Sequence, residues 1–404
     1  MTLPTLFNPY DPQYIADPHA FFARLRETAP VQRATLPDGQ AVWLLTGYAD
    51  VEAAFADPRL VKDVRNARSL DELARLPAPS ETIRYLRCHM LYRDPPDHTR
   101  LRRLVSKAFT PRMVEQLRPR VQAIAEALLD AVAGRGEMDL IEDYAFPLPI
   151  TVIAEMLGIP AADREQFRDW SDALLAAIPP QRAGPAAVAA AEGLRRYLEA
   201  RFEERRRAPT EDLITGLLQA EEAGDKLGKE ELLGMVYLLL VAGYETTANL
   251  IGSGVLALLE HPDQLARLRS DPALLPSAVE ELLRFCAPVA MSTLRYAASD
   301  VTLGGVVIPK GDMMFLVITA ANRDPARFPS PDALDLTRAD NKHLAFGHGI
   351  HYCLGAPLAR LEGEIALGTL WRRMPDLRLG VAPEALTWRP NYALRGLVKL
   401  PVVF

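Results

Sequence analysis

Cysteine is scarce in this sequence: Cys88, Cys286 and Cys353 are the only three in 404 residues. An odd number of widely separated cysteines argues against a disulfide-stapled secreted scaffold and favours a reducing compartment. The first 17 residues also lack the basic start and apolar stretch of a secretory signal, and instead contain several prolines and aspartates. We therefore expect a cytoplasmic protein without a membrane anchor.

The sequence has no excess of positive charge. It contains 46 Lys and Arg against 52 Asp and Glu, for a formal net charge of −6. No overall basic field exists to attract nucleic acid or anionic lipid, so neither is expected as a partner. No internal repeat, polar tract or Gly/Ser linker divides the chain, and we expect one domain over residues 1–404.

Helical periodicity dominates what is present. The pattern predicts helices over residues 112–132, 186–206 and 229–259, with shorter helical stretches between them. Strand-like segments are brief and rich in β-branched and aromatic residues. They cover residues 31–35, 42–46, 292–297, 301–303 and 306–309. The predicted fold class is mainly α with small β-sheets.

Residues 229–259 form the most informative of these segments, because it is apolar on nearly every face and would span about 45 Å as a helix. A transmembrane helix is one alternative. Four polar residues cluster near the middle, however, which favours a buried core helix beside a water-filled cavity or a bound group. They are Glu245, Thr246, Thr247 and Asn249.

A second pointer is the loop from Phe346 to Gly355, in which glycines surround Cys353 just before a helical run. Glycine permits close approach to a large flat group, and a helix N-terminus favours a thiolate. A buried inert cysteine is the ordinary alternative. A zinc site with His348 and His351 is another, although no fourth ligand is suggested nearby.

The loop matches the pattern F-x-x-G-x-x-x-C-x-G in full and resembles the haem-binding signature of the cytochrome P450 family. The resemblance implies that Cys353 is the axial thiolate ligand of the iron of haem b (iron protoporphyrin IX). It also implies that Phe346, Gly347 and Gly355 contact this cofactor. The implied fold is that of the family, with the long helix crossing over the haem.

Other family motifs follow in the expected order. Ala242 and the pair Glu245 and Thr246 resemble the element that lines the haem and delivers protons for O–O cleavage. His98 and Arg102, spaced to share a helix face after a predicted cap at Asp94, resemble the pair that holds a haem propionate.

Two further sets complete the resemblance. Arg295 on a strand and His351 before the cysteine match cofactor-binding positions, again at the propionates. Glu281 and Arg284 resemble the E-x-x-R element, which implies a buried structural cluster completed by Arg338. These motifs cover about residues 94–355.

The resemblance implies a monooxygenase that inserts one oxygen atom from O2 into a C–H or double bond of an apolar substrate, such as a macrolide or other secondary metabolite. No flavin or iron–sulfur module fits in the chain, so electrons are expected from a ferredoxin or flavodoxin with its reductase. The surface on which this electron donor docks is expected to include Arg100, Arg103, Lys107 and Arg112. A peroxide-driven peroxygenase and a non-catalytic haem-thiolate sensor or carrier remain alternatives.

Overall fold

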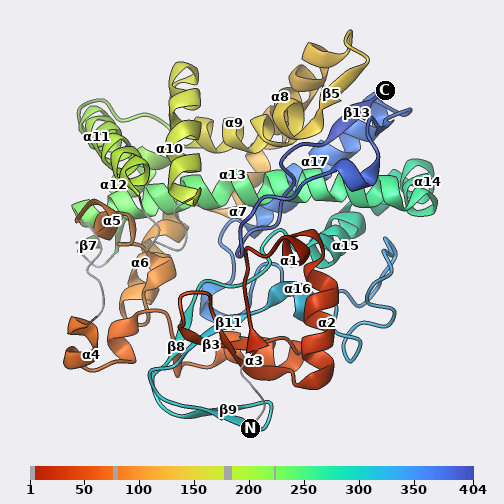
Figure 1. The fold of residues 1–404 in the computed structure, drawn as a ribbon. Helices are drawn as coiled ribbons and strands as arrows, with labels where there is room; N and C mark the ends of the chain where they lie inside the picture. Colours follow the sequence, from red (N-terminus) through yellow and green to blue (C-terminus); the bar gives the residue numbers. More distant parts are fainter. Residues whose placement is uncertain (1–4, 76–80, 177–183, 223) are drawn as a thin grey trace. The chain divides into compact units, whose positions relative to one another are not determined.

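The computed structural model describes residues 5–75, 81–176, 184–222 and 224–404. The chain divides into two compact units. Figure 1 shows the helices and strands of the described residues. Unit 1 comprises Met1–Leu73, Gln122–Phe146 and Thr246–Phe404, and unit 2 comprises Ala74–Val121 and Pro147–Glu245. That the whole chain acts as a single domain stays a prediction.

A six-stranded sheet in unit 1 has the order β1-β2-β3-β11-β8-β4. Strands β2 and β3 form an antiparallel hairpin, and β3 pairs in parallel with β11. The expected strand over 292–297 is shorter than predicted: only its last three residues form β8, in which Arg295 and Tyr296 pair with β11 and Tyr296 and Ala297 pair with β4. The strands are β1 (Thr5–Leu6), β2 (Val31–Thr35), β3 (Ala41–Leu45), β4 (Leu60–Val61), β8 (Arg295–Ala297) and β11 (Met313–Leu316).

Two smaller sheets also belong to unit 1. The first is the hairpin of β9 (Val301–Leu303) and β10 (Val306–Ile308), which confirms the two short strands expected there. In the second, β13 (Pro401–Val403) lies between β12 (Arg378–Leu379) and β5 (Glu137–Asp139).

Helices make up most of the rest of unit 1. A π-helical segment over Ile141–Ala145 follows β5. The α-helices are α1 (Pro12–Ala16), α2 (Pro18–Thr28), α3 (Tyr48–Ala56), α14 (Pro262–Ser270), α15 (Leu275–Cys286), α16 (Ile318–Ala321) and α17 (Ala356–Arg373). Short 3-10 turns cover Val64–Asn66, Pro272–Leu274, Gly349–His351 and Pro383–Ala385.

In the described part of unit 2, helices predominate and the strands are the short pair of β6 (Glu221–Glu222) and β7 (Asp225–Lys226). Its helices are α5 (Glu81–Leu86), α6 (Asp97–Ala108), α7 (Pro111–Gln116), α9 (Pro147–Met156), α10 (Arg164–Ala176), α11 (Pro185–Arg207) and α12 (Leu213–Gln219). Helix α4 (Leu70–Ala74) and helix α8 (Arg118–Val132) each contribute residues to both units.

Two helix boundaries differ from the predictions. The expected cap at Asp94 is wrong: α6 begins at Asp97, and the cap position is Pro96, which makes no side-chain cap bond. The residue before a proline is disfavoured in helical conformation, and Pro95 precedes Pro96, so the helix does not begin directly after Asp94. The single helix over 112–132 is instead two helices, α7 and α8, because Pro119 cannot donate the backbone bond that would continue the first.

Helix α13 (Lys229–Glu260) is continuous over 32 residues, one residue longer at its C-terminus than the sequence predicts. It is long and apolar enough to cross a membrane, yet 61% of its most apolar window is buried within the protein. That is the environment of a core helix. Its small residues allow close packing: a Cβ added at Gly252 would lie 2.4 Å from Ile141 Cδ1.

Candidate functional site

The loop around Cys353 is shaped by glycines in the left-handed region. Gly347 has φ +70° and Gly349 has φ +71°. A Cβ on Gly349 would also lie 2.9 Å from the carbonyl oxygen of Phe55, so a side chain is excluded there. The Cys353 N–H donates to the Phe346 carbonyl at 2.9 Å, and α17 begins three residues later. The loop therefore presents the cysteine just before a helix N-terminus.

The three thiols lie in different environments. Cys353 is exposed, whereas Cys286 is buried and Cys88 is partly buried. Burial raises the pKa of Cys286 to about 12 and also raises the pKa of Cys88. These two thiols are thus held in the neutral form at neutral pH. Cys353 alone combines accessibility with a helix N-terminus, the setting that suits a thiolate ligand.

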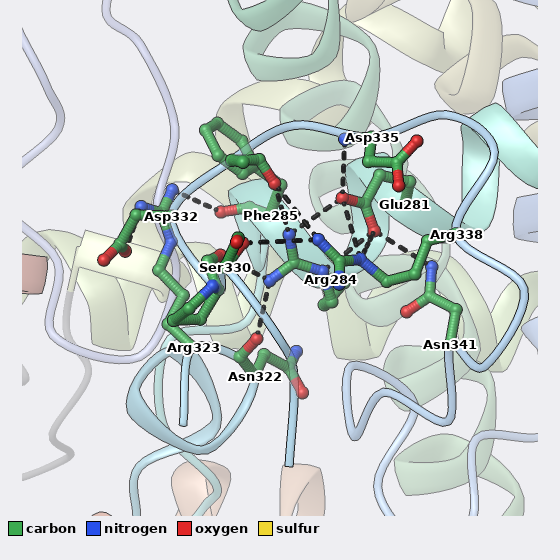
Figure 2. Close-up of polar contacts among 12 residues, drawn as sticks. Glu281, Arg284, Phe285, Asn322, Arg323, Ser330, Asp332, Asp335, Arg338 and Asn341 are labelled. Carbon is green, nitrogen blue, oxygen red and sulfur yellow. Dashed lines mark hydrogen bonds and ion pairs between the residues drawn. The ribbon is translucent and has the colours of Figure 1, made fainter. Parts of the chain in front are cut away.

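Figure 2 shows the cluster around Glu281 and Arg284 on α15. The Arg284 guanidinium is fully buried and donates from Nε and Nη2 to the two carboxylate oxygens of Glu281, each at 2.8 Å. Its remaining donors reach the carbonyls of Asn322, Pro331 and Ala333 at 2.9, 2.7 and 3.1 Å. Every N–H of this guanidinium therefore has an acceptor.

Glu281 is equally well satisfied. Arg338 Nε lies 3.1 Å from its Oε2, so the structure brings together the three residues of the expected cluster. Asp335 N–H and Asn341 Nδ2 also donate to the carboxylate, at 2.9 and 3.1 Å. Sequence reasoning missed Asn341, because nothing in its neighbourhood distinguishes it from a loop asparagine. The cluster fixes the segment that leads into the cysteine loop.

Two buried cations belong to the six-stranded sheet or lie next to it: Arg295 is in β8, and Lys62 directly follows β4. Arg295 donates to the Leu60 carbonyl at 2.9 Å and lies over the Phe55 ring, 5.4 Å from its centroid. Lys62 donates to the carbonyl of Thr293 at 3.0 Å. A buried guanidinium of this kind suits a planar anion such as a propionate. Lys62 was not predicted from the sequence.

The middle of α13 departs from the burial of the rest of the helix. Ala242 is exposed, although Leu240 and Tyr244 are fully buried. Glu245 is 4% exposed and Thr246 is partly buried. A buried carboxyl beside a partly buried hydroxyl is a pair of groups that can hold and pass a proton.

A further buried acid lies on α17 and was missed by sequence reasoning. Burial raises the pKa of Glu362 to about 8, opposed by a hydrogen-bonding interaction with Thr247 of α13. The carboxyl is therefore largely protonated at neutral pH. No sequence signal distinguishes it from Glu364, the other glutamate of this helix.

In unit 2, His98 and Arg102 lie one turn apart on α6, as their spacing predicts. His98 is 3% exposed, and burial together with the nearby Arg102 charge lowers its pKa. A neutral imidazole and a guanidinium on one helix face can both donate to an anion. Arg100 of the same helix instead forms ion pairs with Asp225, at 3.3 Å, and Glu231.

Comparison with known proteins gives the family. The family model described as cytochrome P450 matches residues 136–374. The chain is 50% identical over 398 residues to cytochrome P450 107B1 of Saccharopolyspora erythraea, covering 97% of this chain and 96% of that protein. This chain belongs to the cytochrome P450 family.

Other comparisons agree with this assignment. The cytochrome P450 is 44% identical over 385 residues to 6-deoxyerythronolide B hydroxylase of the same organism, with 94% of each chain covered. The structure of PksS, the bacillaene polyketide synthase cytochrome P450 of Bacillus subtilis, matches with a TM-score of 0.91 at 43% identity, covering 98% of this chain and 99% of that one. The chain is a monooxygenase of this family with the family fold.

The residues of this cytochrome P450 fit the haem-thiolate iron that the family implies. The exposed Cys353 thiol supplies the soft anionic donor. Gly355, two residues after the cysteine, lies beside the sulfur: a Cβ there would be in van der Waals contact with Sγ, at 3.9 Å. The buried guanidinium of Arg295 is a suitable partner for an anionic substituent.

Proposed function

We propose that this cytochrome P450 binds haem b through the Cys353 thiolate and inserts one oxygen atom from O2 into an apolar organic substrate. The observation that carries the proposal is the accessible thiol at the N-terminus of α17, in a glycine-shaped loop. Phe346, Gly347 and Gly355 shape this loop. His98, Arg102, Arg295 and His351 would hold the propionates, and Ala242 would face the cofactor.

The bound haem supplies oxygen activation, and the chain supplies protons and positioning. The Thr246 hydroxyl would hold a water molecule by hydrogen bonding at the centre of α13. The buried Glu245 carboxylate would pass protons to that water, because it precedes Thr246 on the helix and is shielded from bulk solvent. Glu281, Arg284 and Arg338 keep the approach to the cysteine loop rigid.

The substrate class that we propose is a hydrophobic secondary metabolite of the polyketide or macrolide type. The names of PksS and of 6-deoxyerythronolide B hydroxylase support this class. Electrons would come from a ferredoxin or flavodoxin and its reductase, in the cytoplasm. Arg103, Lys107 and Arg112 are exposed on α6 and at the start of α7, and we propose that they face the electron donor. Arg100 forms ion pairs with Asp225 and Glu231.

The test of the oxygen route compares turnover with O2 plus a ferredoxin system and turnover with hydrogen peroxide. The proposal expects product from O2 and electrons. In Thr246→Ala, hydrogen peroxide released per NAD(P)H should rise while product falls. Ser253→Ala, on the same helix and also buried, is the matched control and should leave coupling unchanged. An unchanged product-to-electron ratio in Thr246→Ala would contradict the relay, and turnover with peroxide alone would favour a peroxygenase.

A further inference from the structure

Arg360, in the second turn of α17, is tied to α15 by a two-pronged ion pair. Its Nε and Nη2 donate to the two carboxylate oxygens of Glu280 at 2.6 and 2.9 Å. This arrangement uses the fork geometry of the guanidinium and fixes its plane as well as its position. Side-chain exposures of 33% and 29% show that both partners are largely shielded from solvent.

The same guanidinium contacts two residues of the cysteine loop, both of which precede Cys353. Its carbon lies over the ring of Phe346, 4.6 Å from the centroid, and its Nη1 lies 3.3 Å from the Tyr352 hydroxyl oxygen. Phe346 is the residue whose carbonyl accepts from the Cys353 N–H, and Tyr352 directly precedes Cys353. One side chain thus contacts the loop at its first residue and at the residue directly before Cys353.

Glu280 is held in turn by a second cation-capable group. His343 Nε2 lies 3.3 Å from Glu280 Oε2, and His343 Nδ1 accepts from the Ala345 N–H at 3.2 Å. An Nδ1 that accepts a hydrogen bond places the imidazole proton on Nε2, toward the carboxylate. Burial favours the neutral acid, but the hydrogen bonds from Arg360 and the nearby His343 outweigh it and hold the pKa of Glu280 at about 2. The pair stays ionised throughout the working pH range.

We propose that Arg360, oriented by Glu280, is a positioning residue that holds the Cys353 loop in the geometry required for thiolate ligation. This inference rests on the proposed role of Cys353. The adjacent residues Glu280 and Glu281 of α15 then stabilise different segments. Glu281 holds the segment before the cysteine loop, and Glu280 holds the loop itself through Arg360. Loss of the guanidinium would free the Phe346 ring and the Tyr352 hydroxyl and let the sulfur leave its position.

The test measures how fast the reduced CO complex of the holoenzyme loses its thiolate-type Soret band under mild heating. We expect Arg360→Met to lose the band roughly tenfold faster than the wild type, because the substitution removes a charge-assisted contact. Arg360→Lys, which keeps the charge but not the fork, should be intermediate. Global stability is measured in parallel by urea unfolding.

Arg327→Met is the matched control. Arg327 also forms a two-pronged pair with an acid, Asp340, at 2.9 and 2.7 Å, and lies over an aromatic ring, that of Phe328. The Arg327→Met variant should have a lower free energy of unfolding without faster loss of the Soret band. Equal rates of band loss in Arg360→Met and Arg327→Met would overturn the proposal. If Arg360→Met does not fold, Glu280→Gln should show faster band loss, and a wild-type rate there would also overturn it. Absence of the band in the wild type would instead refute the thiolate role of Cys353.

Discussion

Arg284 donates two hydrogen bonds of 2.8 Å to Glu281, one to each carboxylate oxygen, and neither side chain is more than 1% exposed. The two residues lie three positions apart on α15. Burying either charge without the other would cost a large desolvation free energy. Here the two charges pair, and the surrounding carbonyls and Arg338 complete their hydrogen bonding. Loss of either partner should therefore lower the free energy of unfolding by a large amount.

Glu281→Gln should lower the free energy of unfolding by about 3–5 kcal/mol, because it leaves the buried Arg284 charge without its counter-charge. Urea unfolding of the holoenzyme measures this change. The matched control is Glu203→Gln in the exposed i,i+3 pair Glu203–Arg206 of α11, which should cost about 0–1 kcal/mol. Similar losses at both positions would contradict the special role of the buried cluster.

Glu362 predicts a distinct pH dependence of stability. Burial raises its pKa in the folded protein to about 8, so between its ordinary value and pH 8 the folded state binds a proton that the unfolded state has released. This group therefore destabilises the protein increasingly as pH rises through that window, by up to about 1.4 kcal/mol per pH unit. Glu362→Gln should remove this slope, and its advantage over the wild type should be larger at pH 8 than at pH 5. A pH-independent difference in unfolding free energy would contradict the assignment.

Gly234 on α13 marks a close approach within unit 2. A Cβ there would lie 2.8 Å from the carbonyl carbon of Cys88 and 3.0 Å from the carbonyl oxygen of Tyr85, and backbone atoms cannot easily move. Gly234→Ala should cost about 1–3 kcal/mol of unfolding free energy. Gly134→Ala, where a Cβ meets nothing within 4 Å, is the control and should be nearly neutral. Thermal unfolding separates the two outcomes, and a neutral Gly234→Ala would contradict this packing.

Charge reversal on α6 tests the docking of the electron donor. Arg103 and Lys107 lie one turn apart and are both exposed. Reversal of both to Glu should slow reduction by a ferredoxin about tenfold at low salt, with a smaller effect at high salt because ions screen the attraction. The double reversal of Arg206 and Arg207 makes the same change in net charge on α11 and should have little effect. Stopped-flow reduction rates that are equal in the two variants would exclude this face.

The sequence predicts the large elements well, because long apolar periodicity and local turn chemistry determine them. Helix α13 and the hairpin strands at 301–303 and 306–308 have nearly the expected bounds. The start of α6 was predicted wrongly, because two consecutive prolines compete with an aspartate cap.

Site residues carried by spaced motifs could be predicted from the sequence. Glu362, Asn341 and the Glu280–Arg360 pair could not. Their importance comes from neighbours distant in the chain: Thr247 lies beside Glu362, and α15 lies beside the loop that Arg360 contacts. Single residues on an amphipathic helix or in a loop carry no local signal of such burial or pairing.

The most direct test of the thiolate role is the absorption spectrum of the reduced holoenzyme with CO. The wild type and Cys286→Ser should both give the thiolate-type Soret band, because Cys286 is buried and neutral. Cys353→Ser should lose that band even where haem is retained. A thiolate-type band in Cys353→Ser, or its absence in the wild type, would contradict the assignment of Cys353 as the iron ligand.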